Sequence, residues 1–310
     1  MSLENSNSQI AIVGGTGFIG QHLINYLIEK KVFTVRALTR NQNFSNFDKS
    51  IKIIEGSLSS RTALDKLTKD QNIVINLGYI NNDYKSNIKA IEQLVDSAIN
   101  SGVSKLIHFS TAIVAGRVNN KIITEDTECR PFNEYEKTKL AIEKRILELA
   151  HKKIEVIIIR PTAVFGLGGI NLLKTIKSIL NQSRILSTAQ LMLNKFRSMH
   201  LVPVEYVVSA THFLITTPKD LSGEIFILSM DDQKNNNFFY VINRIAIISN
   251  AKKYSERCFP FSSLFLEIIL RILGRSKIKP YQLYSNKKIK KYGYLSDSNF
   301  ETSLDEFIEY

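Results

Sequence analysis

The stretch Val13-Gly14-Gly15-Thr16-Gly17-Phe18-Ile19-Gly20 decides the fold of this chain. It directly follows a short apolar run at 10–13, which indicates a buried strand, and it opens a helical pattern that continues to Ile28. Its glycines recur at three-residue spacing: Gly14, Gly17 and Gly20. Glycines at such a junction allow a tight turn, close approach of the backbone to a pyrophosphate and close packing of helix on sheet. Because the helix N-terminus also presents free amides to phosphates, the stretch predicts a dinucleotide site.

The first half of the chain alternates between two kinds of pattern. Short runs rich in β-branched residues predict four more strands, at 34–38, 73–77, 105–109 and 156–159. Helical periodicity predicts two longer helices between the last three of these runs, one over 88–99 that stops at Gly102 and one over 134–150. Strands that alternate with helices in this way predict βαβ units. The fold class is therefore α/β, with a Rossmann-type doubly wound parallel sheet.

The alternation is lost after Pro161. Glycines at 166–169 indicate a loop, mixed helical stretches come next, and one further strand is expected at 225–228. We predict a dinucleotide-binding core over 1–165, completed by about 200–228. The remaining stretches, 166–199 and 229–310, would form a smaller C-terminal substrate-binding region.

Composition excludes several classes of protein. With 310 residues, 44% hydrophobic and 23% charged, the chain is neither wholly disordered nor a collagen or coiled coil. Two cysteines are too few for a disulfide framework or a four-cysteine zinc site, so we expect no metal site and a reducing compartment. The polar start lacks the pattern of a signal peptide, and no run of about 20 apolar residues exists. We expect a cytoplasmic protein.

The positive charge is concentrated in one segment. The chain has a formal net charge of +12, and residues 252–291 alone hold eleven basic and two acidic residues, a net +9. Such a cluster favours an anionic partner: nucleic acid, a membrane surface or a phosphorylated substrate. A solvated face without a partner is the alternative, and the charge alone leaves both open.

The glycine spacing, Gly-x-x-Gly-x-x-Gly, resembles that of the extended short-chain dehydrogenase/reductases, the NAD-dependent epimerase/dehydratase family that includes nucleotide-sugar epimerases. The resemblance is strong over 10–166 and looser afterwards. It implies NAD or NADP as the cofactor. It also implies cofactor contacts from Gly14, Gly17, Phe18, Ile19, Gly20, Arg40, Leu58, Leu77, Tyr135, Lys139 and Thr162.

The end of the second strand bears on the choice of cofactor. An acidic residue there would bind the ribose 2′-hydroxyl of NAD, but this chain has Arg40, which can pair with a 2′-phosphate. Arg40 therefore favours NADP. Alternatively, Arg40 only caps the adenine pocket, as it could with either cofactor. The family's Gly-Asp-Leu segment reads Gly56-Ser57-Leu58 here, which weakens one adenine contact.

Tyr135 and Lys139 lie four residues apart, which places them on one face of a helix. A phenol is a poor base at neutral pH, and a neighbouring ammonium is expected to lower its pKa. By default such a pair is a surface pair, but its place after the fourth strand matches the family's catalytic pair. The resemblance implies that Thr111 is the third catalytic hydroxyl and binds the substrate oxygen, with Ser110 as the alternative. Asn87 matches a family asparagine that supports the site, although an ordinary helix residue is an equal interpretation.

The substrate region is matched more loosely. The segment 160–166 resembles one that borders nicotinamide and sugar, which makes Ala163 a substrate contact. Arg197 resembles an arginine that meets the substrate diphosphate, and an arginine fork suits two phosphates. His200 is interpreted as structural. The resemblance also implies a homodimer through the helices of Asn87 and Tyr135.

The two residues after Thr111 narrow the choice of reaction. Dehydratases of the family carry an Asp-Glu pair there, but this chain has Ala112 and Ile113, which cannot transfer protons. We therefore expect an epimerase or 4-ketoreductase that acts on a nucleotide-linked sugar for surface polysaccharide synthesis. The substitutions Ala163 and Ala115 and the presence of Arg40 favour the reductase or a less typical epimerase. The alternatives are a sterol-type dehydrogenase/isomerase and a non-catalytic cofactor-binding regulator.

A dinucleotide fold and a diphosphate substrate make nucleic acid the weakest partner for the basic segment, and we expect none. The segment also contains an apolar stretch at 263–273, which as a helix could lie in an anionic membrane surface as part of a contact through 257–291. The preferred interpretation is a helix that packs on the substrate-binding region.

Overall fold

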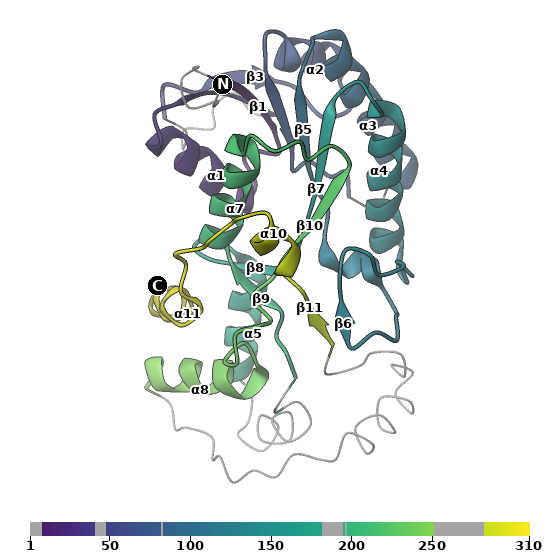
Figure 1. Ribbon diagram of the computed structural model, residues 1–310. Coiled ribbons are helices and arrows are strands. Elements are labelled where there is room, and N and C mark those ends of the chain that lie inside the picture. The colour runs from purple at the N-terminus through teal and green to yellow at the C-terminus, as the bar shows by residue number, and fades with distance from the viewer. Residues whose placement is uncertain (1–7, 41–47, 82, 182–194, 196, 251–281) are drawn as a thin grey trace. The chain divides into compact units, whose positions relative to one another are not determined.

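The computed structural model describes residues 8–40, 48–81, 83–181, 195, 197–250 and 282–310 (Figure 1). The chain divides into two compact units. Unit 1 comprises 1–116, 131–161 and 208–226, and unit 2 comprises 117–130, 162–207 and 227–310. Each unit is described by itself.

Unit 1 is built on a seven-stranded sheet with the order β10-β7-β5-β4-β1-β2-β3. The strands are β1 (Ser8–Val13), β2 (Phe33–Thr39), β3 (Lys52–Glu55), β4 (Ile73–Asn76), β5 (Lys105–Phe109), β7 (Glu155–Pro161) and β10 (Glu224–Leu228). Neighbouring strands from β3 to β7 pair in parallel, with Ile10 opposite Val35 on one side and Ile73 on the other. The Rossmann-type parallel sheet predicted from the sequence is confirmed. The edge strand β3 was not predicted.

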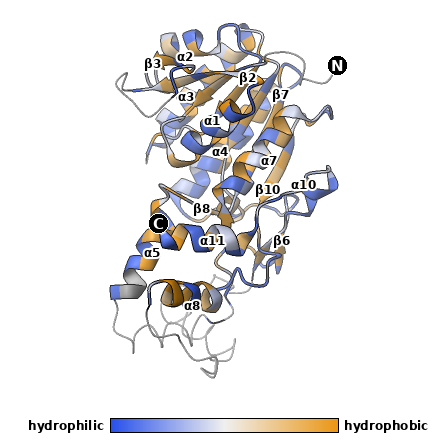
Figure 2. Ribbon diagram, turned by 90° about the vertical axis from the view of Figure 1, so that its left-hand side faces the viewer, coloured by the Kyte–Doolittle hydropathy of each residue, from blue (hydrophilic) through white to orange (hydrophobic). Residues whose placement is uncertain are grey.

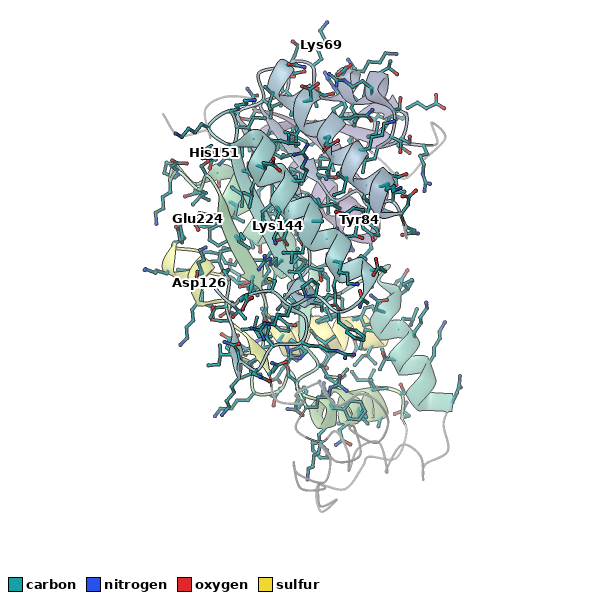
Figure 3. All side chains as sticks on the ribbon, turned by 90° about the vertical axis from the view of Figure 1, so that its right-hand side faces the viewer. Lys69, Tyr84, Asp126, Lys144, His151 and Glu224 are labelled. Carbon is teal, nitrogen blue, oxygen red and sulfur yellow. The ribbon has the colours of Figure 1, made fainter. Side chains whose placement is uncertain are left out.

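One face of this sheet is covered by α2 (Arg61–Thr68), α3 (Tyr84–Asn100) and α4 (Glu134–Ala150). Their apolar side chains pack in one cluster with residues of β1, β4, β5 and β7, such as Ala11, Val74 and Leu106. Figure 3 shows α3 and α4 side by side, with Tyr84 at the start of α3 and Lys144 on the outer side of α4. In Figure 2 the strands of the sheet are hydrophobic along their length while the helices carry hydrophilic outer faces. The helices predicted over 88–99 and 134–150 are therefore present, and the first begins four residues earlier.

The other face is covered by α1 (Phe18–Glu29) and by the part of α7 (Val204–Thr216) that belongs to unit 1. His212 of α7 makes edge-to-face contacts with Tyr26 of α1 and Phe33 of β2. The buried Lys105 ammonium donates to the carbonyl of Leu214, 3.1 Å away, near the C-terminus of α7. A cation at this end of a helix meets its unpaired carbonyls and its negative dipole. This bond fixes α7 to the start of β5.

The strand order reverses between β1 and β4. β1 leads through α1 to β2 on one side, whereas β4 leads through α3 to β5 on the other. The connections after the two strands therefore diverge and leave a crevice at their carboxyl ends, where open α/β sheets bind ligands. The glycine stretch follows β1, and Leu77 follows β4.

Unit 2 contains two small parallel pairs and several helices. The pairs are β6 (Ile122–Ile123) with β11 (Leu283–Tyr284), and β8 (Ala163–Phe165) with β9 (Leu201–Pro203). The helices include α5 (Ile170–Asn181), α8 (Phe238–Ile248), α10 (Lys287–Lys291) and α11 (Phe300–Glu309). Phe165 packs edge-to-face on Phe300 and Phe307 of α11, and Arg244 of α8 pairs with Asp305. These contacts join β8, α8 and α11 in one core.

Most of the basic segment lies outside the described residues. The helix expected at 263–273 falls there, and of the contact predicted through 257–291 the structure describes only 282–291. Within that part Lys290 pairs with Asp232. No helix in the described ranges combines the length and apolar character needed to cross a membrane.

Candidate active site

The glycine stretch has the geometry that its sequence predicts. Gly14 has a φ of +81°, and a Cβ there would lie 2.9 Å from the backbone carbon of Leu77. A Cβ on Gly20 would lie 2.4 Å from the carbonyl oxygen of Gly14. The first position therefore needs a left-handed backbone next to β4, and the second lets α1 pack directly on the turn. No larger side chain fits either position without movement.

The N-terminus of α1 is open to a phosphate. Gly17 is its N-cap residue and has no side chain to accept from the first amides. Phe18 and Ile19 come next in the first turn and are half-buried. Free amides combined with the helix dipole form an anion site. The residues present therefore fit the pyrophosphate of a dinucleotide.

A cavity of about 540 Å³ lies beside this turn. It is lined by residues at and after the ends of β1, β2, β3 and β4: Val13, Gly14, Thr16, Gly17, Leu38, Thr39, Arg40, Gly56, Ser57, Leu58, Ser59, Leu77, Gly78, Tyr79, Ile80 and Asn81. The cavity thus brings together five of the predicted cofactor contacts: Gly14, Gly17, Arg40, Leu58 and Leu77. The size of the cavity suits the adenosine part of a dinucleotide. So does its position between β1 and β4, where the strand order reverses.

Arg40 and Ser57 line the same part of the cavity. The two strands that precede them are tied by a bond from Gly56 N to the Thr39 carbonyl, 2.8 Å long. Arg40 is exposed, and hence its guanidinium is free to meet a ligand at the rim. No carboxylate belongs to the lining, so nothing in the described cavity wall would repel a 2′-phosphate.

A capping box fixes the start of α4, where Tyr135 lies. The Asn133 side chain accepts from Glu136 N at 2.9 Å, and the Glu136 carboxylate accepts from Phe132 N at 2.6 Å. The first bond satisfies an amide that the helix start leaves free, and the second ties the residue before the N-cap to the first turn. Tyr135 is held in the first turn with its side chain 37% exposed, so its phenol can reach a ligand. The Asn-x-x-Glu pattern could have been recognised in the sequence but was missed.

Lys139 lies one turn further and is buried. Its ammonium donates to the carbonyl of Phe109, 2.9 Å away at the end of β5. Burial lowers the pKa of Lys139 to about 8, although Glu143 acts in the opposite direction. Glu143 is itself paired with Arg160 of β7 through two bonds of 3.0 and 2.6 Å. A neutral and a charged form of Lys139 are thus both accessible near neutral pH.

The expected lowering of the Tyr135 pKa is not what the structure has. The pKa of Tyr135 is raised, first by burial and second by the neighbouring Tyr79. The rings of Tyr79 and Tyr135 meet edge-to-face with centroids 5.1 Å apart. The physical reason is that a phenolate loses hydration in this setting, while the Lys139 ammonium is engaged by Phe109.

Thr111 follows β5 at the N-cap position of the short 3₁₀ helix η2 (Ala112–Ala115), against which α4 packs, and its side chain makes no capping bond. Its side chain is half-buried, whereas Ser110 is only 6% exposed and its hydroxyl has no partner within the described residues. Of the two alternatives, Thr111 is therefore the more accessible hydroxyl. Ile113 of η2 is 42% exposed and apolar, in the place where dehydration would need an acid.

Two buried asparagines hold the loop after β4. Asn76 accepts from Gly78 N at 2.9 Å, and its amide nitrogen lies 3.1 Å from His108 Nδ1. His108 Nδ1 therefore accepts, which assigns the neutral Nε2–H tautomer. Burial keeps the pKa of His108 well below its usual value, with Lys139 adding to the effect. Asn87 donates to the Ile80 carbonyl and accepts from Ile80 N, and so holds the backbone after β4. Its support of the active site stays a prediction.

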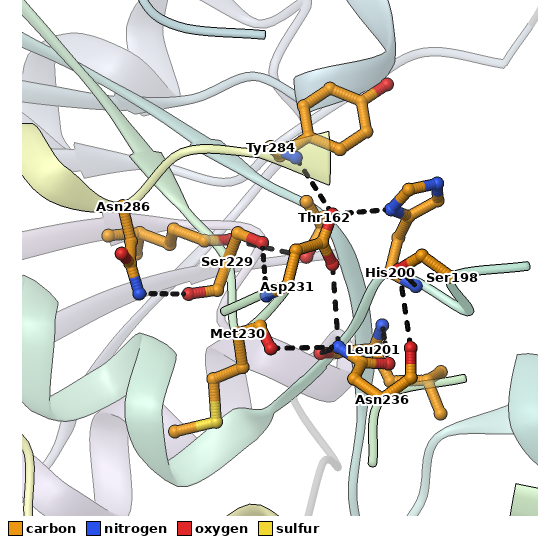
Figure 4. Close-up of polar contacts among 11 residues, drawn as sticks. Thr162, Ser198, His200, Leu201, Ser229, Met230, Asp231, Asn236, Tyr284 and Asn286 are labelled. Carbon is orange, nitrogen blue, oxygen red and sulfur yellow. Dashed lines mark hydrogen bonds and ion pairs between the residues drawn. The ribbon is translucent and has the colours of Figure 1, made fainter. Parts of the chain in front are cut away.

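Of the predicted substrate contacts, Thr111 lies in unit 1, whereas Ala163 and Arg197 lie in unit 2 and are exposed. Thr162, a predicted cofactor contact, is buried in unit 2 and bonds the carbonyl of Leu228. Figure 4 shows the polar network around Asp231, whose buried carboxylate meets His200 Nδ1 at 2.6 Å and accepts from Tyr284 N at 2.8 Å. Asp231 thus connects His200, which precedes β9, with Tyr284 of β11, and this agrees with the structural interpretation of His200.

The parallel sheet, the glycine turn and the cavity beside it are those of a Rossmann-type dinucleotide-binding protein. The model of the NAD dependent epimerase/dehydratase family matches residues 10–228, and the chain belongs to this family.

The curated relatives of this chain differ in the function that their names give. The chain is 26% identical over 148 residues to the low-salt glycan biosynthesis protein Agl12 of Haloferax volcanii, which covers 42% of this chain and 48% of that protein. It is 29% identical over 175 residues to UDP-glucose 4-epimerase of Vibrio cholerae, covering 51% and 52%. It is also 29% identical over 167 residues to a mouse (Mus musculus) decarboxylating sterol-4-alpha-carboxylate 3-dehydrogenase, covering 50% and 45%. The chain spans about half the length of these relatives.

Solved structures share the fold over nearly the whole chain. UDP-glucuronic acid 4-epimerase from Bacillus cereus in complex with NAD superposes with a TM-score of 0.73 and 19% identity, covering 97% of this chain and 96% of that one. This likeness supports the fold.

Proposed function

We propose that the protein is an NAD(P)-dependent epimerase or 4-ketoreductase of a nucleotide-linked sugar, acting in surface polysaccharide synthesis. The observation that carries the proposal is the arrangement at the end of β5 and the start of α4. There a partly exposed tyrosine, a buried ammonium and the hydroxyl of Thr111 lie in one unit with the dinucleotide cavity. UDP-glucose 4-epimerase among the relatives supports a nucleotide sugar, and Agl12 supports a role in glycan synthesis.

Each residue has a distinct task in this reaction. NAD(P), when bound, would supply or accept the hydride. The Thr111 hydroxyl would hold the sugar oxygen, and the Tyr135 hydroxyl would move the proton at that oxygen. Lys139 would keep positive potential next to the phenol and the cofactor ribose. Arg197 would bind the substrate diphosphate, and Ala163 would border the sugar.

Tyr135 carries its proton at neutral pH, because its pKa is raised above the ordinary value. A protonated phenol can donate to a keto oxygen, as reduction requires. An epimerase uses the same step when it reduces its keto sugar, so the preference for the 4-ketoreductase rests on Arg40, Ala115 and Ala163. Ala112 and Ile113, which offer no acid, argue against dehydration.

The proposal is tested by identifying the bound cofactor and by measuring turnover of a panel of sugars. Mass spectrometry of the co-purifying cofactor, and then incubation with UDP- and dTDP-sugars with and without NADPH, separates the reactions. Retained NAD with interconversion of epimers supports the epimerase, and stoichiometric oxidation of NADPH with a 4-keto sugar supports the reductase. Absence of turnover of every sugar, with Tyr135→Phe indistinguishable from wild type, would refute both.

A sterol substrate is the second candidate, because a sterol-4-alpha-carboxylate dehydrogenase matches half of the chain at 29% identity. Incubation with NAD⁺ and a 3β-hydroxysterol 4-carboxylate tests it directly. Oxidation of this compound, without turnover of any nucleotide sugar, would replace the first proposal.

A further inference from the structure

The ring of Tyr79 contacts both members of the predicted catalytic pair. The Lys139 ammonium lies over its face, 5.1 Å from the centroid, and the Tyr135 ring meets it edge-to-face, also at 5.1 Å. Tyr79 also belongs to the wall of the dinucleotide cavity. One side chain therefore connects the cavity with the two groups that would move the proton.

The backbone on both sides of Tyr79 is fixed. Asn76 of β4 binds the amide before Tyr79 at 2.9 Å, and Asn87 of α3 binds both polar backbone groups of Ile80 after it, at 2.9 and 2.5 Å. The Tyr79 hydroxyl interacts with the Thr138 side chain on α4. The half-buried ring can turn aside only by losing its contacts with α4.

The ring face also contributes to the charge balance of Lys139. An aromatic face attracts a cation, and more strongly where water is excluded. The other groups around this buried ammonium are the Phe109 carbonyl, the Glu143 carboxylate on the same helix and His108 on β5. Glu143 is shared with Arg160, and His108 is neutral. The Tyr79 face is thus a favourable contact that Glu143 and His108 do not replace.

We propose that Tyr79 is a positioning residue of the active site, whose ring holds the Lys139 ammonium and orients the Tyr135 phenol beside the dinucleotide cavity. Nothing in the resemblance or the relatives assigns this residue a role. Its kinetic consequence rests on the proposed function, but its effect on Lys139 does not.

The first experiment needs no substrate. Competitive acetylation of the whole protein over a range of pH, read by mass spectrometry at Lys139, gives the pKa of this lysine in wild type, Tyr79→Phe and Tyr79→Leu. We expect Phe to behave as wild type, and Leu to lower the pKa of Lys139 by about half a unit to one unit because the cation–π contact is lost. An unchanged pKa in a folded Leu variant would overturn the inference. If the Leu variant does not fold, Tyr79→Met takes its place, because the unbranched methionine side chain can fill the same space without an aromatic face.

The second experiment separates positioning from a simple wall of the cavity. In Tyr79→Leu we expect kcat to fall about tenfold while the cofactor dissociation constant stays within about threefold, and Tyr79→Phe to restore kcat. A weaker cofactor with unchanged kcat would mean that Tyr79 only lines the cavity, and would overturn the proposal. If wild type turns over no sugar or sterol, the proposed function fails, while the acetylation result still decides whether Tyr79 holds Lys139.

Discussion

Burial shifts the two ionisable groups of the Tyr135–Lys139 pair toward their neutral forms. It raises the pKa of the phenol and lowers that of the ammonium to about 8. At neutral pH the phenol therefore keeps its proton, and the ammonium gives one up more readily than an ordinary lysine. A pair in these states can donate a proton to a substrate oxygen from the phenol and replace it from the lysine.

Replacement of Tyr135 by Phe should remove proton transfer and leave the site otherwise intact. The ring contact with Tyr79 remains, since only the hydroxyl is lost. We expect kcat to fall by about 10²- to 10⁴-fold, the usual contribution of a positioned acid or base. Cofactor affinity, measured by fluorescence titration with NADPH, should change little. Tyr84→Phe, which alters an exposed tyrosine at the start of α3, is the control and should keep full activity.

Lys139 gives a prediction for stability. Its pKa is about 8 in the folded protein against an ordinary 10.5, so between these values the unfolded chain binds the proton more tightly. Stability therefore rises with pH through this range, and below it the buried charge costs roughly 3 kcal/mol. Relative to Lys139→Met, which removes the titration, the wild type should gain several degrees in melting temperature between pH 7 and pH 10.

The matched control is Lys144→Met, on the exposed side of the same helix (Figure 3). Its melting temperature relative to wild type should stay constant over this pH range. If the difference in melting temperature between wild type and Lys139→Met is equally constant with pH, then the Lys139 ammonium is not the buried cation described above.

Among the helices, α1 depends most closely on a single small residue. Alanine at Gly20 should raise helix propensity by about 1 kcal/mol, yet its Cβ would meet the Gly14 carbonyl at 2.4 Å. We expect the steric effect to dominate, with a net loss of roughly 1–3 kcal/mol in unfolding free energy and at least tenfold weaker NAD(P) binding. Thermal melting and titration with NADPH measure the two effects. Asn25→Ala, exposed on the same helix, should leave NAD(P) binding unchanged and stabilise the protein slightly, by about 0.5 kcal/mol.

A helix or strand can be predicted from the sequence where the pattern of its own side chains is enough to form it. The helix over 134–150 has the predicted bounds, because its periodicity coincides with a capping box at Asn133. The edge strand β3 has only four residues, two of them exposed and charged, and its pairing with β2 rather than its own pattern makes it a strand. Tyr79 was missed for a similar reason, because only the packing of α3 and α4 near the end of β4 reveals what its ring contacts.

At the level of the two units, pairing over long distances limits what a sequence can indicate. Ile122 and Ile123 form a strand only because Leu283 and Tyr284 lie beside them, far along the chain. Asp231 binds both His200 and Tyr284, which no spacing in the chain connects. The glycine stretch and its cavity, by contrast, lie within the first 81 residues and could be predicted. The domain boundaries, the homodimer and the membrane contact stay predictions.

Cofactor choice can be measured on the stability of the whole molecule. A ligand that binds only the folded protein stabilises it by about 2.7 kcal/mol at a hundredfold excess over its dissociation constant. For a chain of this size that corresponds to a rise of roughly 5 °C in melting temperature. We expect NADP⁺ to give a larger rise than NAD⁺ at equal concentration.

The variant Arg40→Ala tests the role of this arginine. Its rise in melting temperature with NADP⁺ should fall to half or less, since a bond to a charged group contributes about 1.5–3 kcal/mol, while its rise with NAD⁺ persists. The control Lys89→Ala removes an exposed charge from α3 and should change neither rise. Equal losses with both cofactors in Arg40→Ala would instead favour the adenine-pocket interpretation of this arginine, and a protein that prefers NAD⁺ from the start would contradict the prediction.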